Sequence, residues 1–178
     1  MSIGVADIMP SSAERSICVG TVVRRDSRVL MVRQTPSHSL GPVWTIPWGV
    51  AQAGESPTLA ASRETLEESG VTIDIVGLIG MQELPDPWAG TLALIFLGRH
   101  VAGEPKPDGV ETDAASYMTL DELRLSNDRF EPWSHWLVQA VLAGSDFCLL
   151  PMIGNPFHPS SGYFAQAPSQ SHEHRRER

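Results

Sequence analysis

The sequence predicts an α/β fold in which helices pack on a mixed β-sheet. Residues 16–34, 71–84 and 91–101 are rich in β-branched and aliphatic side chains and predict strands. Residues 56–70 and 131–144 have the composition and spacing of helices. The order is therefore strand-rich, helix, strand-rich, helix, which is typical of a sheet covered by helices.

Residues 16–34 predict a hairpin, because a polar turn at Arg25, Asp26 and Ser27 divides two runs of β-forming residues. The turn-forming residues of 35–42 predict a loop. Residues 43–56 alternate apolar residues with Gly and Pro, which indicates a short strand that leads into a tight loop.

The next segment carries the clearest helix signal of the chain. Ser56 can cap the helix, and Pro57 stands at the first helical position, where its missing N–H costs nothing. Gly70 can end the helix in the left-handed conformation. We therefore expect a helix between Ser56 and Gly70.

The second half predicts two strands at 71–84 and 91–101, a strand at 115–120 that runs into a short helix, and a final helix. We expect the final helix to group apolar side chains on one face: Trp133, Trp136, Leu137, Ala140 and Val141. If that aromatic face is exposed, it could serve a homodimer.

The domain organisation follows from composition. We expect a flexible leader at 1–14, one domain at 15–150, and a disordered tail at 151–178, where His, Pro, Ser, Gln and Arg predominate.

The overall composition excludes several classes of protein. The 178 residues are 42% hydrophobic and 19% charged, as in globular domains. A formal net charge of −8 argues against a nucleic-acid duplex as partner, since phosphate contacts need clustered Lys and Arg. No apolar run approaches the ~20 residues of a membrane span, and we see no secretion signal. Cys18 and Cys148 are interpreted as buried free thiols, which favours a cytoplasmic location.

The stretch SRETLEESG places three carboxylates at the end of the first helix. Glu64 and Glu68 lie one turn apart, Glu67 is also one turn from Glu64, and Arg63 can pair with Glu67. A solvated helix face would tolerate this arrangement. A hard cation such as Mg²⁺ would use it, because such ions bind carboxylate oxygens together with substrate phosphates.

The longer run GVAQAGESPTLAASRETLEESGV resembles the Nudix box. In that pattern a Gly (Gly49) is followed after five residues by a Glu (Glu55), and seven residues later by REUxEExGU, where U is aliphatic. Every fixed position matches, and Thr65 is the one departure, at an aliphatic position. The resemblance extends over about residues 16–145.

The resemblance implies a Nudix-type α/β/α sandwich, with the box helix packed on the mixed sheet, and hydrolysis of a nucleoside diphosphate linked to another moiety using Mg²⁺ or Mn²⁺. By position, Glu67 and Glu68 would be metal ligands and Glu64 a ligand or general base. Arg63 would orient the glutamates and pair with Glu55.

The resemblance also implies a further metal ligand and a further catalytic residue. The Trp48 carbonyl would give the metal a further oxygen, and Glu111 would be the catalytic acidic residue of a later loop, with Asp113 as the alternative. We expect the substrate, a small phosphorylated nucleotide such as ADP-ribose or a nucleoside triphosphate, to contact a set of five residues: Trp44, Trp48, Gly49, Glu55 and Trp88. Pro87 is a hint of ADP-ribose preference.

Two alternatives remain open at this point. The first is a non-catalytic Nudix module that senses a nucleotide. The second is an isopentenyl diphosphate isomerase of the same superfamily, which would need a catalytic cysteine in the cleft. Cys18, near a strand start, does not match that requirement well.

Overall fold

The computed structural model describes residues 16–86, 88–144, 150–151 and 162–164. The leader expected at 1–14 and Pro87 lie outside the described residues, as does most of the tail expected at 151–178. Within that tail, short strands are present at Leu150–Pro151 (β8) and Gly162–Phe164 (β9).

The chain opens with the expected hairpin. Strand β1 (Ile17–Arg25) pairs antiparallel with β2 (Arg28–Gln34), and Arg25 lies opposite Arg28. Asp26 adopts a positive φ of 57°, which short polar side chains tolerate in tight turns.

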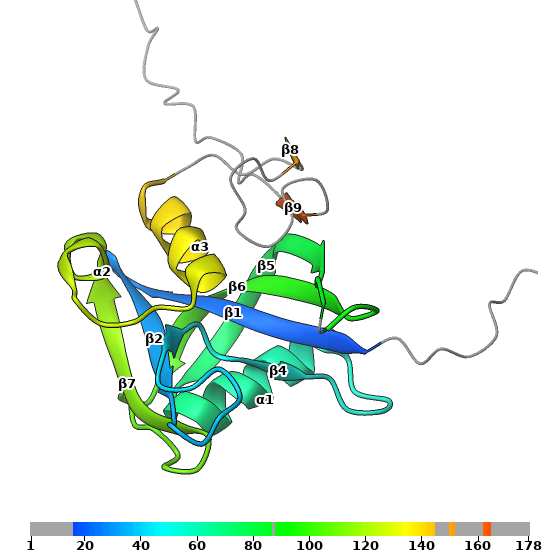
Figure 1. Cartoon of the computed structure of the whole chain (residues 1–178), viewed down its shortest axis with the longest axis horizontal. Helices are drawn as coiled ribbons and strands as arrows, with labels where there is room; N and C mark the ends of the chain where they lie inside the picture. Colours follow the sequence, from blue (N-terminus) through cyan, green and yellow to red (C-terminus); the bar gives the residue numbers. More distant parts are fainter. Residues whose placement is uncertain (1–15, 87, 145–149, 152–161, 165–178) are drawn as a thin grey trace, which may run out of the picture.

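The remaining strands extend this hairpin into one mixed sheet (Figure 1). They are β3 (Trp44–Thr45), β4 (Trp48–Val50), β5 (Thr72–Glu83), β6 (Leu92–Ala102) and β7 (Thr112–Thr119). Among the described residues the strand order is β3-β2-β1-β6-β5-β9-β8, with β4 paired to β1 and β7 paired to β2. Strand β1 is parallel to β6, whereas β5 and β6 are antiparallel.

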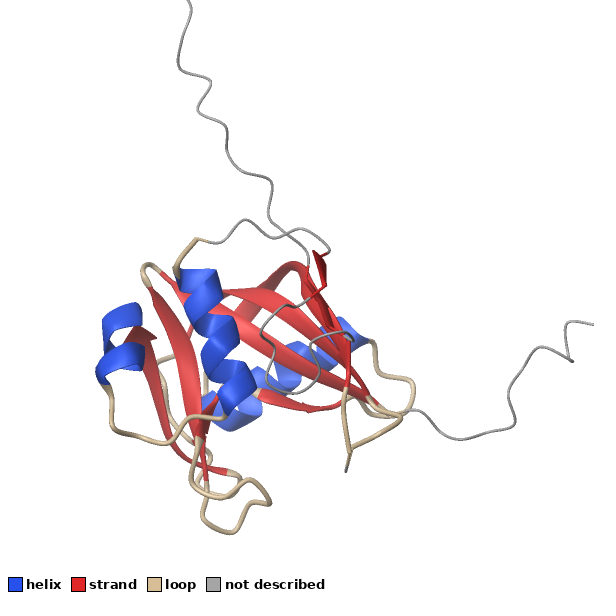
Figure 2. Cartoon of the chain, turned by 45° about the horizontal axis from the view of Figure 1, so that its top comes forward, coloured by secondary structure: helices blue, strands red, loops and turns tan. Residues whose placement is uncertain are grey.

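Helices cover both faces of the sheet, as Figures 1 and 2 show. Helix α1 (Pro57–Ser69) packs on one face, where Ala60 and Ala61 share a buried cluster with Val19 of β1. Helices α2 (Leu120–Leu125) and α3 (Pro132–Leu142) belong to the core of the other face. The predicted α/β/α sandwich is confirmed.

The ends of α1 are those that the sequence predicts. The Ser56 hydroxyl accepts a hydrogen bond from the backbone N–H of Leu59, and Pro57 is the first residue of the helix. Gly70 takes a φ of 68°, and its N–H donates to the Leu66 carbonyl. These caps fix where the helix ends, and therefore where its last-turn carboxylates lie.

The final helix differs from expectation in the use of its apolar face. Trp133, Leu137 and Val141 are buried in the protein's own core, together with Val138, which the expected face omitted. The expected exposure of this face is therefore wrong, while the homodimer itself stays a prediction. None of the described helices has the length and apolar character needed to cross a bilayer.

Replacement of Leu137 by Ala tests the core beneath α3. Leu137 is fully buried, so its truncation leaves a cavity and should lower the free energy of unfolding by ~2–5 kcal/mol. Leu125→Ala is the matched control, because Leu125 is 81% exposed. Urea unfolding of both variants measures the difference. Equal, small effects would contradict the assigned packing of α3.

Candidate active site

A cavity of about 370 Å³ lies where the end of α1 meets β1, β4 and four loops. These loops follow β2, follow β4, join β5 to β6 and precede β7. The residues that border the cavity include Cys18, His38, Trp48, Gly49, Gln52, Glu64, Glu68, Trp88 and Glu111. Segments that are distant in sequence therefore bring acidic and aromatic side chains to one place.

Glu68 is the most deeply buried carboxylate of this cavity, with an exposed fraction of 2%. It accepts hydrogen bonds from the backbone N–H of Trp48 at 3.0 Å and from Gln34 Nε2 at 3.3 Å. Burial raises its pKa to about 8, against the stabilising effect of these two donors. No cationic side chain bonds to Glu68 among the described residues.

Glu64 lies against the backbone of Gly49. A Cβ at Gly49 would stand 2.1 Å from the Glu64 carboxyl carbon, so only glycine leaves room for this carboxylate. Burial raises the pKa of Glu64, while Arg63 opposes the rise. The requirement for Gly at this position of the box thus has a direct steric reason.

Arg63 connects the carboxylates to the preceding loop. Its Nε and Nη2 donate to Glu55 at 2.9 Å, and its Nη1 donates to Glu64 at 2.8 Å and to Glu67 at 2.9 Å. The guanidinium holds the pKa of Glu55 at about 2, and the hydrogen bonds that Arg63 donates to these carboxylates raise its own pKa. Arg63 therefore fixes the box loop to the helix, in the orientation that the resemblance implies.

The later-loop carboxylate in the cavity is Glu111. It borders the cavity and acts electrostatically on both Glu64 and Glu68. Asp113 instead pairs with Arg33 at 2.6 Å. Glu111, rather than the alternative Asp113, therefore lies beside the box glutamates.

The tryptophans separate into two groups. Trp48 and Trp88 border the cavity, and Trp88 is 37% exposed. Trp44 lies in the core, with its indole N–H bonded to Asp128 at 3.2 Å. We therefore remove Trp44 from the expected substrate-binding set, because its ring is already packed and partnered. The predicted contact of Trp48 with the metal uses the carbonyl, whereas the contact that the structure shows is from its N–H to Glu68.

Three residues of this region did not enter the predicted site. Cys18 borders the cavity from β1, which corrects the view that it is badly placed for the cleft. Burial raises the pKa of the Cys18 thiol, and the negative charge of Glu64 raises it further. His38 borders the cavity from the loop after β2. Gln34 donates a hydrogen bond to Glu68. Cys18 and Gln34 belong to strands whose side-chain direction only the sheet register decides.

The residues present fit a divalent cation. Glu68 is buried without a cationic partner, and the buried Oε1 of Gln34 has no hydrogen-bond partner among the described residues. In the same part of the chain, no group of three acidic, His or Cys side chains is arranged to hold a metal ion. Glu64 and Glu67 both accept hydrogen bonds from Nη1 of Arg63 instead. Carboxylates of this kind are the oxygen ligands that Mg²⁺ and Mn²⁺ prefer.

Comparison with known proteins assigns the chain to a family. The model of the NUDIX domain matches residues 14–139. The chain is a member of the Nudix family. It is 31% identical over 104 residues to a MutT-like protein of Streptomyces ambofaciens and 32% identical over 108 residues to the NAD-capped RNA hydrolase NudC of Vibrio vulnificus.

These matches cover 58% and 60% of this Nudix chain, which spans 63% of the length of the first relative and 39% of the second. A Nudix hydrolase structure from Nitrosomonas europaea superimposes with a TM-score of 0.65 at 20% identity, covering 76% of this chain and 74% of that one. That structural likeness supports the fold of the Nudix domain.

Replacement of Glu68 by Gln should change how stability depends on pH. The pKa of Glu68 is about 8 in the folded protein and 4.5 for the ordinary group. As the pH rises through this window, the unfolded chain loses its proton before the folded one, so stability falls. Without divalent metal, the Tm of the wild type should therefore fall more steeply than that of Glu68→Gln between about pH 5 and pH 8. Parallel profiles would contradict the assigned burial.

Replacement of Gly49 by Ala tests the steric role of the box glycine. The added methyl must displace the Glu64 carboxylate, which is the free end of a side chain, so the fold should persist while metal affinity falls. Titration with Mn²⁺ and a thermal melt measure the two properties. Gly54→Ala is not a suitable control because Gly54 has a positive φ, whereas Gly77→Ala meets open space. Unchanged Mn²⁺ binding in Gly49→Ala would contradict this account.

Proposed function

We propose that this Nudix chain is a metal-dependent pyrophosphohydrolase that cleaves a nucleoside diphosphate linked to another moiety. The observation that carries the proposal is the cavity in which Glu64, Glu68 and Glu111 lie together with the half-buried Trp48 and the exposed Trp88. Acidic side chains alone would repel a diphosphate, so the arrangement is useful only with cations that neutralise both.

Each acidic residue has a role in this proposal. Glu67, Glu68 and Glu64 would hold Mg²⁺ or Mn²⁺, with the Trp48 carbonyl as a further oxygen. Such ions, when bound, screen the diphosphate charge and polarise a water molecule. Glu64 or Glu111 would accept the proton of the attacking water, and the raised pKa of Glu64 supports this role.

Arg63 contributes through the other residues rather than through the substrate. Its bonds to Glu55, Glu64 and Glu67 preorganise the helix end. Preorganised charge lowers the cost of rearrangement during the reaction. The products would be a monophosphate and a phosphorylated second moiety.

The aromatic part of the cavity supports a nucleotide as substrate. A narrow apolar recess adjoins the cavity and shares Leu40, Trp48, Leu84 and Trp88 with it. Trp133 borders this recess, and its buried indole N–H has no hydrogen-bond partner among the described residues. The recess has a volume of only about 20 Å³, so a heteroaromatic ring of the substrate would lie in the larger cavity, against Trp48 and Trp88, rather than inside the recess.

The substrate candidates are ADP-ribose, a nucleoside triphosphate and, by similarity to NudC, an NAD-type dinucleotide. The position of Cys18 supports a second candidate, a diphosphate isomerase. A half-buried thiol with a raised pKa that borders the same cavity as Glu64 could donate a proton while the carboxylate accepts one. A nucleotide-sensing module without activity is the remaining alternative.

A product-release assay over ADP-ribose, NAD, sugar nucleotides, dinucleoside polyphosphates and oxidised dNTPs, with and without Mg²⁺, tests the proposal. We expect Mg²⁺-dependent release of a monophosphate from at least one of them. Binding without turnover of any compound would favour the sensor. Rearranged isopentenyl diphosphate, lost in Cys18→Ser, would favour the isomerase.

Replacement of Glu67 by Gln tests the metal assignment. The Glu67 side chain is 57% exposed, so the fold should remain intact while turnover falls by a factor of about 10² or more, the scale expected for loss of charge stabilisation. The matched control is Asp121→Asn, which removes an exposed carboxylate of α2, outside the box. Glu83 is not a suitable control, because it already interacts with another residue. Full activity of Glu67→Gln would contradict the assignment.

A further inference from the structure

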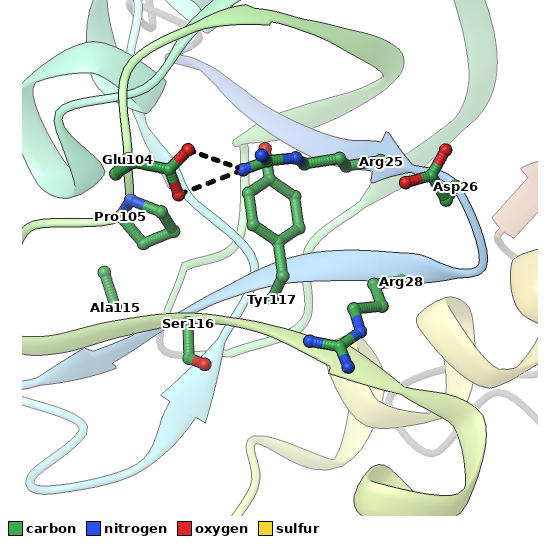
Figure 3. A pocket seen from close by; sticks show the side chains of 8 residues that line it. All are labelled: Arg25, Asp26, Arg28, Glu104, Pro105, Ala115, Ser116 and Tyr117. Atoms are coloured by element: carbon green, nitrogen blue, oxygen red, sulfur yellow. Dashed lines mark hydrogen bonds and ion pairs between the residues drawn. The ribbon is translucent and has the colours of Figure 1, made fainter.

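A second, larger cavity of about 560 Å³ lies at the other end of strand β1. Cys18, near the start of this nine-residue strand, borders the candidate active site, whereas Arg25, its last residue, borders the second cavity. Figure 3 shows that this cavity is formed by the β1–β2 hairpin, strand β7 and the segment after β6. None of the described residues borders both cavities.

Two arginines border this cavity, and their guanidinium groups point to different parts of it (Figure 3). Arg25 and Arg28 are directly opposite across the hairpin, and both side chains border the cavity. Like charges in opposite cross-strand positions destabilise a hairpin. Arg28 makes no hydrogen bond or ion pair within the part of the chain that the structure describes. Arg28 acts electrostatically on Glu122, but no hydrogen bond among the described residues uses its donors.

The second guanidinium is held in place, but by a replaceable partner. Arg25 Nη1 lies 3.0 Å from both carboxylate oxygens of Glu104, whose side chain is 77% exposed. Its guanidinium carbon lies 5.5 Å from the centre of the Tyr117 ring. The Tyr117 hydroxyl is fixed by His100 Nδ1 at 2.8 Å. Exposed ion pairs contribute little to stability, so an anion could replace Glu104 on a guanidinium that is already oriented.

We propose that this cavity is a second binding site, which takes the phosphate group of a small phosphorylated molecule of nucleotide size. Arg25 and Arg28 bind the phosphate from the two strands of the hairpin, and the hydroxyl of Ser116 on β7 lies on the same wall (Figure 3). Guanidinium groups match phosphate oxygens in charge and geometry. The volume falls within the roughly 300–1,000 Å³ of small-molecule sites.

The charges of the cavity define the conditions for binding. Glu104 pairs with Arg25, Asp26 also borders the cavity, and Glu122 interacts electrostatically with Arg28. Binding therefore requires Glu104 to leave Arg25, which its exposure permits. Removal of the Glu104 charge should strengthen binding, whereas removal of the Arg28 charge should weaken it. A site of this kind is independent of hydrolysis in the other cavity.

Titration of the full chain with AMP in the presence of EDTA tests the proposal. Arginine Nε–H signals in NMR spectra report each guanidinium separately, so binding in the other cavity does not interfere. We expect AMP to shift the signals of Arg25 and Arg28 in a saturable manner. Arg28→Gln should weaken this binding about tenfold, as loss of one charge-assisted contact would, and Glu104→Gln should strengthen it. Arg99→Gln, which removes an arginine paired with Asp74, is the matched control.

Two results would overturn the proposal. One is the absence of any shift at Arg25 and Arg28 when AMP is raised to millimolar concentration. The other is equal affinity of the wild type and Arg28→Gln. Because Glu104→Gln and Arg28→Gln are expected to change the affinity in opposite directions, partial unfolding of either variant cannot imitate the expected pattern.

Discussion

The burial of the Glu68 carboxylate is the constraint on which the rest of the site depends. An ionised carboxylate is unfavourable in a protein interior unless a cation or several donors compensate for the lost water. Glu68 has only the Trp48 N–H and the Gln34 amide. Its pKa of about 8 leaves the carboxyl group largely protonated near neutral pH, and a bound cation would favour the ionised form. This cost to stability has an evident use only when a cation is bound.

The fold limits the loss of stability that the burial of Glu68 causes. The Gly70 cap ends α1 immediately after Glu68, and the pairing of β4 with β1 presents the Trp48 N–H to its carboxylate. Arg63 compensates the more exposed Glu64 and Glu67, so only one of the three box carboxylates lacks a cationic partner. Thr65, the one departure from the box pattern, is fully buried and donates its hydroxyl to the Ala61 carbonyl. A polar group is therefore accommodated at an aliphatic position.

Local signals in the sequence account for the parts that could be predicted. The caps of α1 and the turn at Asp26 depend on neighbouring residues, and the spacing within the box places Glu64, Glu67 and Glu68 on one helix end. Side-chain direction on the strands is different, because it depends on pairing between distant segments. Trp44 and Trp48 are only four residues apart, yet one lies in the core and the other borders the cavity. Cys18 faces the cavity for the same kind of reason, since its place follows from the register with Val50.

The central claim is that Glu64 and Glu68 hold a divalent cation in this cavity. Crystals of the full chain soaked with Mn²⁺ and a non-hydrolysable ADP analogue would test it through the anomalous scattering of manganese. The account predicts a peak about 2–2.5 Å from carboxylate oxygens of both residues, the range of metal–oxygen bonds in proteins. A peak at any other place, or none at millimolar Mn²⁺ while the analogue is bound, would contradict it.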